Sequence, residues 1–223
     1  MSQIIPVHGN YQELGSYRNS VVIYDGTVDF CNRFLKKGDR TIDQMIQAAR
    51  SGKQNIVEGC MASGTSTETE IKLIGVARAS LEELLEDYRD HLRTRDLPLW
   101  EKTDPRILAI RQLSRQNNNT YETYKTYLEQ GNNTSELFCN LMISLIHQTC
   151  YLLDRYLQSL DRQFAEKGGI RERMLRTRNT DKIAKREKAL ALLREIYREL
   201  ASSNQQILME KVADAAQILK DNW

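Results

Sequence analysis

The sequence contains very little proline and almost nothing that predicts a β-sheet. Only three of its 223 residues are proline and eleven are glycine, while 28% are charged. Valine and aromatic runs that alternate with polar residues are missing, which disfavours strands. This composition is typical of a mainly helical protein, and the length allows a substantial core. We therefore predict an all-α fold.

An excess of charge of one sign and long apolar runs are also lacking. The net charge is +2, so a case for nucleic-acid or membrane binding has to rest on a local region. No apolar run approaches the roughly eighteen residues that a membrane-spanning helix needs. The first ten residues lack the basic and apolar regions of a secretory signal. We expect a cytoplasmic protein that does not contact a membrane.

Paired cysteines are absent as well. The four cysteines, Cys31, Cys60, Cys139 and Cys150, are widely spaced and form no CxxC motif, so we predict reduced core residues. His147 lies three residues before Cys150, but two ligands without a third or fourth do not make a metal site. We predict neither a metal nor a cofactor.

What the sequence does contain is helical periodicity. Apolar residues at spacings of three and four predict four long helices, at about 19–35, 39–62, 67–95 and 133–167. The first is expected to bury Val21, Tyr24, Val28, Cys31 and Leu35. The last is expected to bury Phe138, Leu141, Leu145, Leu152, Tyr156 and Leu160. A capping box of Thr67 and Glu70 is predicted to start the third helix.

The intervening segment 96–133 is less regular. Pro98, a short helix from Asp104-Pro105 to about Arg115 and the run 117–119 of three asparagines predict an insertion. Its tyrosines, Tyr121, Tyr124 and Tyr127, are expected to pack onto the long helices. The prediction is an antiparallel up-and-down four-helix bundle (18–167) with an insertion between helices 3 and 4. A lead-in (1–17) precedes it, and a C-terminal helical extension (168–223) follows.

The second and third helices carry small residues where an ordinary amphipathic helix has leucine. Ala48, Gly52, Asn55 and Gly59 recur on one face, and Gly75 and Ala79 recur on the other helix. A glycine inside a helix costs about 1 kcal/mol relative to alanine. That cost is tolerated where two helix backbones approach closely, so we predict a tight crossing of these helices.

Polar groups accompany this crossing. The predicted structural polar motif comprises Arg50, Ser51, Asn55, Glu58, Gly59, Ser80 and Glu83. Glu58 and Glu83 on facing helices resemble a catalytic or metal-binding carboxylate pair. A di-metal bundle uses Glu-x-x-His motifs, however, and His8, His91 and His147 all lack that spacing. We predict no enzymatic activity and a polar network that fixes helix register, with a subunit contact as the alternative.

Gly168-Gly169 ends the fourth helix, and a locally basic segment follows. The candidate nucleic-acid contacts in it are Arg171, Arg173, Arg176, Arg178, Lys182, Lys185 and Arg186. One hypothesis is that these side chains contact phosphates. The other is that the segment docks on the acidic face of the third helix, at Glu82, Glu86 and Asp90. Apolar periodicity beyond the segment predicts two further helices.

Two linked sequence blocks carry a family resemblance. AARSGKQNIVEG followed by GVARASLEEL resembles the paired motifs of four-helix-bundle proteins related to the 23S ribosomal RNA intervening-sequence protein. The accessory protein of diversity-generating retroelements shares that fold. The matching residues are Arg50, Ser51, Asn55, Ile56, Glu58 and Gly59 in the first block and Ala77, Ser80, Glu83 and Leu84 in the second. Ala79 replaces the usual glycine.

The resemblance covers about residues 18–165, and GGIRERM (168–174) is similar to a suffix domain found in one branch of the family. It implies a closed homo-oligomer, specifically a homopentamer. The retroelement proteins bind a reverse transcriptase and nucleic acid. We therefore expect a non-enzymatic oligomeric adaptor for RNA, DNA or a nucleic-acid-processing enzyme. The alternative is a protein-only assembly scaffold whose suffix docks on the bundle or on a partner protein.

Overall fold

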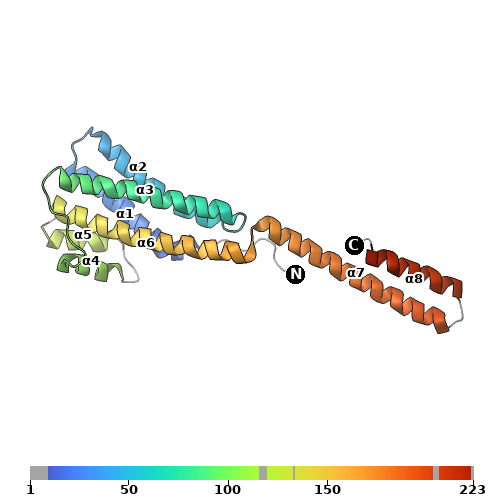
Figure 1. Ribbon diagram of the computed structural model, residues 1–223. Coiled ribbons are helices and arrows are strands. Elements are labelled where there is room, and N and C mark those ends of the chain that lie inside the picture. The colour runs from blue at the N-terminus through green and yellow to red at the C-terminus, as the bar shows by residue number, and fades with distance from the viewer. Residues whose placement is uncertain (1–9, 116–119, 133, 203–205, 222–223) are drawn as a thin grey trace. The chain divides into compact units, whose positions relative to one another are not determined.

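A computed structural model describes residues 10–115, 120–132, 134–202 and 206–221 (Figure 1). The predicted lead-in residues 1–9, the asparagine run 117–119 and Asn133 lie outside this part of the chain. All regular elements in the described ranges are helical, which confirms the all-α prediction. In chain order they are η1 (Tyr11–Glu13), α1 (Gly15–Phe34), α2 (Arg40–Ala62), α3 (Thr67–Arg93), α4 (Pro105–Ser114), α5 (Tyr121–Gln130), α6 (Ser135–Lys167), α7 (Ile170–Ser202) and α8 (Gln206–Asp221).

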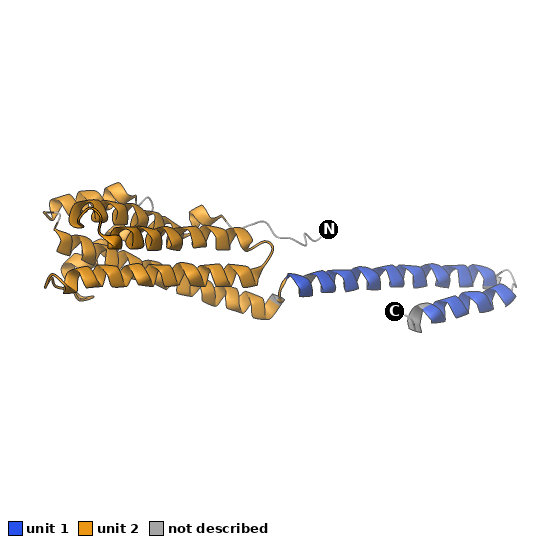
Figure 2. Ribbon diagram, turned by 90° about the horizontal axis from the view of Figure 1, so that it is seen from above, with its two compact units in different colours: residues 1–4, 170–223 blue, residues 5–169 orange. Residues whose placement is uncertain are grey.

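The chain divides into two compact units, residues 5–169 and residues 170–223 with 1–4 (Figure 2). We call the described parts of these the N-terminal unit and the C-terminal hairpin. In the N-terminal unit α1 packs against α2 and α6, and α3 packs against the same two helices. The insertion adds α4, which packs on α6, and α5, which packs on α1. In the C-terminal hairpin α7 packs against α8.

The first helix differs from its prediction at its start and on its buried face. α1 begins at Gly15, inside the predicted lead-in, and Ser16 and Ser20 are buried. Of the residues expected on its buried face only Cys31 is buried, and the other four are half-buried, namely Val21, Tyr24, Val28 and Leu35. Thr27, in contrast, is fully buried. The Thr27 hydroxyl donates to the Ile23 carbonyl at 2.7 Å, which satisfies it inside the core. Apolar periodicity missed this face because small hydroxyl side chains form part of it.

The cap of α3 is also shifted from its prediction. Ser66, not Thr67, is the N-cap, and its hydroxyl accepts from the Thr69 amide at 3.1 Å. Glu70 does not reach back to close a capping box. It is buried at 2% exposure and accepts a hydrogen bond from the Tyr156 hydroxyl of α6.

Helices α2 and α3 cross closely, but the glycines that allow this close approach all belong to α2. A Cβ on Gly52 would lie 2.9 Å from the side chain of Leu81, and one on Gly59 would lie 3.1 Å from Ile74. Gly75 has open space around it, and Ala79 is exposed. The two predicted small-residue stripes therefore do not face each other. Large apolar side chains of α3 fill the space above the glycines of α2.

One segment of α6, residues 137–146, is buried on every side. All ten residues from 137 to 146 are buried, including the polar Asn140 and Ser144. A helix with one partner layer shows a single apolar stripe, so burial all round requires cover from α1, α3 and α4 together. Leu152, which was predicted to be buried, is exposed by 38%. Leu152 and Tyr156, which is half-buried rather than buried, lie beyond this fully covered segment.

Replacing glycines on the two helices with alanine is expected to have opposite effects. Gly52→Ala should destabilise the protein by about 1–2 kcal/mol, because overpacking against buried Leu81 outweighs the gain in helix propensity. Gly75→Ala meets no atom within 4 Å and should stabilise the protein by about 0.5–1 kcal/mol. Urea unfolding of both variants measures this, and equal stabilisation by the two would contradict the close crossing.

Candidate functional site

The structure brings together three members of the predicted polar motif. The hydroxyls of Ser51 on α2 and Ser80 on α3 lie 2.9 Å apart. Asn55 donates its side-chain N–H to the Ser51 carbonyl at 2.9 Å and to the Ser51 hydroxyl at 3.2 Å. These contacts pair two helices at one level, as a register-fixing contact requires.

The charged members of the motif lie elsewhere. Arg50, Glu58 and Glu83 are all exposed, so none of them belongs to a buried network. The polar network between α2 and α3 therefore contains fewer residues than predicted. Gly59 has no Cβ and so allows the side chain of Ile74 on α3 to pack closely against α2. In the part of the chain that the structure describes, no group of three or more His, Cys, Asp and Glu residues is arranged to hold a metal.

The cysteines are core residues, as predicted. All four are buried and free. Burial raises the pKa of Cys31 to about 11 and that of Cys150 to about 12. Both thiols are therefore protonated at neutral pH and are weak nucleophiles.

The candidate nucleic-acid contacts lie on α7, which runs unbroken from the basic segment into the predicted fifth helix. Five of them are exposed: Arg171, Arg176, Arg178, Lys182 and Lys185. Arg186 is half-buried, and the side chain of Arg173 lies outside the described residues.

Four of these cations share one side of α7. At 100° per residue, Arg171, Arg178, Lys182 and Lys185 fall within an arc of about 60° and extend over about 21 Å of helix. We call these four residues the basic stripe. Arg176 falls outside it. The α7 helix thus arranges most of the predicted contacts as a line, which the sequence alone showed only as a charge-rich segment.

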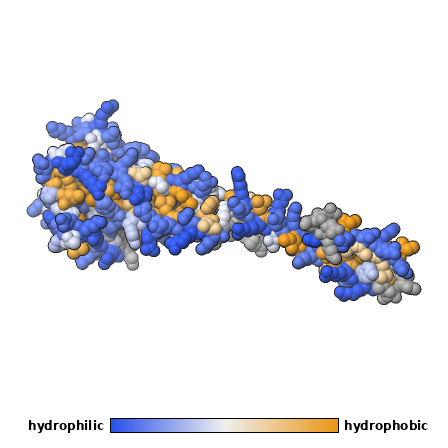
Figure 3. Space-filling view, in the orientation of Figure 1, coloured by the Kyte–Doolittle hydropathy of each residue, from blue (hydrophilic) through white to orange (hydrophobic). Residues whose placement is uncertain are grey.

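The C-terminal hairpin has little core of its own. None of its described side chains is buried, and large apolar residues are exposed by 41–75% on both helices. Figure 3 shows hydrophobic patches on its surface. The hairpin also differs from the rest of the chain in charge. Residues 170–223 hold twelve of the 32 Lys and Arg and eight of the 30 Asp and Glu, a net +4 against −2 for residues 1–169.

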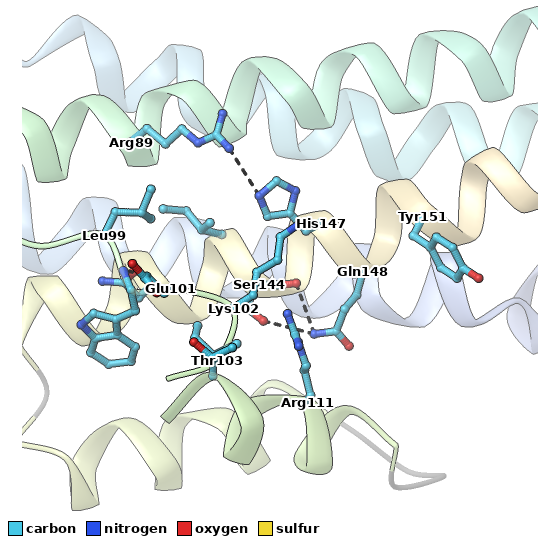
Figure 4. Close-up of a pocket in the computed structure, with 14 residues that line it drawn as sticks. Arg89, Leu99, Glu101, Lys102, Thr103, Arg111, Ser144, His147, Gln148 and Tyr151 are labelled. Atoms are coloured by element: carbon cyan, nitrogen blue, oxygen red, sulfur yellow. Dashed lines mark hydrogen bonds between the residues drawn. The ribbon is translucent and has the colours of Figure 1, made fainter. Parts of the chain in front are cut away.

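The sequence did not predict a further feature, a cavity of about 850 Å³ in the N-terminal unit. It lies between α3, the segment 99–103, α4 and α6, and we call it the Trp100 pocket (Figure 4). Its polar lining includes Arg89, Arg111 and His147, which are 22 to 58 positions apart in the sequence. The one sequence signal that could have indicated this pocket is the apolar cluster around Trp100 within an otherwise polar insertion.

Glu70 of α3 is a buried carboxyl group with one hydrogen-bond partner, Tyr156 of α6. The Tyr156 hydroxyl donates to it at 2.5 Å. Burial raises the pKa of Glu70, and the hydrogen bond from Tyr156 partly offsets that rise. Burial also raises the pKa of Tyr156, and Glu70 adds to the rise, so the phenol remains the donor.

Scans against protein-family models, curated proteins and solved structures find no match for this chain. Among the described helices, none has the length and apolar character to span a membrane.

Stability should depend on pH through Glu70. A carboxyl group with a raised folded-state pKa stabilises the fold fully below its unfolded value of 4.5, and this contribution is lost as pH rises through the folded-state pKa. Glu70→Gln keeps an acceptor for Tyr156 but does not titrate. The stability of the wild type should therefore fall relative to that of Glu70→Gln as pH rises above 4.5.

Urea unfolding at several pH values measures this difference. Tyr156→Phe is the control, because it leaves Glu70 without its donor and should make the loss of stability with pH steeper. A constant difference between wild type and Glu70→Gln across pH would contradict the prediction.

Proposed function

We propose that the chain is a non-enzymatic oligomeric adaptor that binds nucleic acid, or an enzyme that processes it such as a reverse transcriptase, through its C-terminal hairpin. In this proposal the N-terminal unit is an antiparallel up-and-down four-helix bundle that assembles the oligomer, with a pentamer favoured. The basic stripe is the observation that carries the proposal. Its four side chains are exposed and lie along one side of a helix.

The geometry of the stripe suits a phosphate backbone. Phosphate contacts by Lys and Arg provide most of the affinity of non-specific nucleic-acid binding. Four such contacts are few for one chain, so repetition of the stripe in an oligomer matters. Linked copies bind with an effective concentration that raises overall affinity by orders of magnitude. The resemblance to the intervening-sequence protein family supports such an oligomer.

The second candidate function is a protein-only assembly scaffold, in which the hairpin docks on the bundle or on a partner protein. Exposed apolar side chains such as Ile183, Leu192 and Ile207 favour it, because burying them on another protein surface would stabilise the hairpin. The carboxylates of α3 that were candidates for docking, Glu82, Glu86 and Asp90, each lie 2.6–3.5 Å from an arginine of α3, so this function is favoured by apolar contact more than by charge.

Charge reversal of the stripe distinguishes the two functions. The triple variant Arg171→Glu, Arg178→Glu, Lys182→Glu should lose at least tenfold in affinity for single-stranded RNA and DNA. The slope of log affinity against log salt should become shallower by about 2–3 for three lost phosphate contacts. Fluorescence anisotropy with labelled oligonucleotides at several salt concentrations measures both quantities.

A matched control keeps the total charge change equal. Arg194→Glu, Arg198→Glu, Lys211→Glu alters three exposed cations of the same hairpin outside the stripe, and it should bind like wild type. Equal loss in both variants, or no wild-type binding even at low salt, would exclude direct nucleic-acid contact by the stripe. If the stripe variant instead dissolves the oligomer, the docking function is supported.

The oligomer is tested separately. Light scattering of the purified chain should give about five times the 25.9 kDa mass of one subunit. A monomer would remove the contribution of multivalency to binding.

A further inference from the structure

We propose that the Trp100 pocket binds a small molecule that carries an anionic group on an apolar ring system. The pocket belongs to the N-terminal unit alone, so this inference is independent of the hairpin and of the proposed adaptor function. Its volume of about 850 Å³ is within the range of cavities that enclose small ligands.

The walls of the pocket are mainly apolar. Trp100, Ile107 and Ile143 are buried and line it from the insertion, α4 and α6, while Leu99 and Tyr151 are exposed at its margins. Such walls favour a ligand with an aromatic or alicyclic body, because its transfer from water releases about 25 cal/mol per Å² of apolar area.

The charged groups around these walls are mostly cationic. Arg89 of α3, Lys102 of the insertion and Arg111 of α4 line the pocket, against a single carboxylate, Glu101. In Figure 4, Arg89 extends from α3 toward His147 of α6, and Arg111 points from α4 toward Gln148. Cations supplied by three separate elements surround one cavity, and this arrangement favours an anion.

Arg89 has donor capacity left for a ligand. One of its terminal nitrogens donates to Glu86 at 2.6 Å, and the other lies 3.4 Å from Nε2 of His147. Its Nε is buried and has no hydrogen-bond partner among the described residues. The two terminal nitrogens together carry four N–H donors, and the contacts to Glu86 and His147 use two of them, so N–H groups remain for a bound carboxylate or phosphate.

The apolar wall is held rigidly in place. The Trp100 amide donates to the Asn140 side chain at 2.8 Å, and the indole Nε1 donates to Glu136 at 2.6 Å. The Arg106 guanidinium lies 3.6 Å from the centre of the indole ring. A wall fixed by these contacts does not have to be ordered on binding, which preserves affinity.

His147 should make binding pH-dependent. Burial lowers its pKa, and the nearby cations Arg89, Lys102 and Arg111 lower it further, while Glu82 raises it. A bound anion would oppose the repulsion from these cations and raise the pKa of His147 in the complex. Affinity for an anion should therefore increase as pH falls through the pKa of His147, and His147→Gln should remove this dependence.

The test uses 1-anilinonaphthalene-8-sulfonate and its neutral analogue N-phenyl-1-naphthylamine on the full-length chain. Calorimetry should show saturable binding of the sulfonate at one site per chain. Arg111→Gln should weaken it at least tenfold and change binding of the neutral analogue less than twofold. Arg115→Gln, an equal charge change at the C-cap of α4 and outside the pocket lining, should leave both unchanged. Thermal unfolding verifies that each variant is folded.

Three results would overturn the proposal. They are the absence of saturable sulfonate binding, an equal loss in Arg111→Gln and Arg115→Gln, and an equal loss for the charged and neutral probes. Binding of the sulfonate to exposed apolar residues of the hairpin would leave its affinity the same in wild type, Arg111→Gln and Arg115→Gln, which overturns the proposal in the same way as the second result.

Competition then distinguishes the anionic groups. We expect 1-naphthoate, 1-naphthyl phosphate or both to displace the sulfonate, and the stronger competitor identifies the preferred group. Inorganic phosphate should compete at least tenfold more weakly, because it lacks the apolar body. If it competes equally well, the apolar walls contribute nothing and the proposed ligand class is wrong.

Discussion

The complete burial of residues 137–146 of α6 is the constraint on which the N-terminal unit depends. A segment that is buried on all sides needs helices around it, and α1, α3 and α4 provide this cover. The segment also contains Asn140, a buried amide whose polar atoms need partners. It donates to the carbonyls of Pro98 and Glu136 at 3.0 and 2.9 Å and accepts from the Trp100 amide. These bonds tie the start of the insertion to α6.

The Trp100 pocket follows from the same arrangement. Asn140 holds the segment around Trp100 against α6, and α4 follows from Pro105 with Ile107 and Ile110 buried. The cavity remains between these elements and α3, where Arg89 and Arg111 approach α6 from two sides (Figure 4). The insertion thus covers the core and also creates a chemically distinct cavity that is open to solvent.

The C-terminal hairpin is stabilised differently. It buries none of its described side chains, so apolar burial between its two helices contributes little to its stability. Its exposed apolar and cationic residues are better suited to contacts outside the hairpin. For this reason both functions proposed for it, phosphate binding and protein docking, involve surfaces that the hairpin does not itself cover.

The sequence by itself determined the helical class, the approximate extent of the four long helices before Gly168 and the buried cysteines. Periodic spacing and caps are local properties that the chain carries directly. Which small or polar residues are buried was decided only by the tertiary structure. Gly52 lies under Leu81 whereas Gly75 meets open space, and Ser80 pairs across helices whereas Glu83 is exposed. Burial of a residue depends on the partner helix. For the same reason, Arg89, Arg111 and His147 come together only through folding.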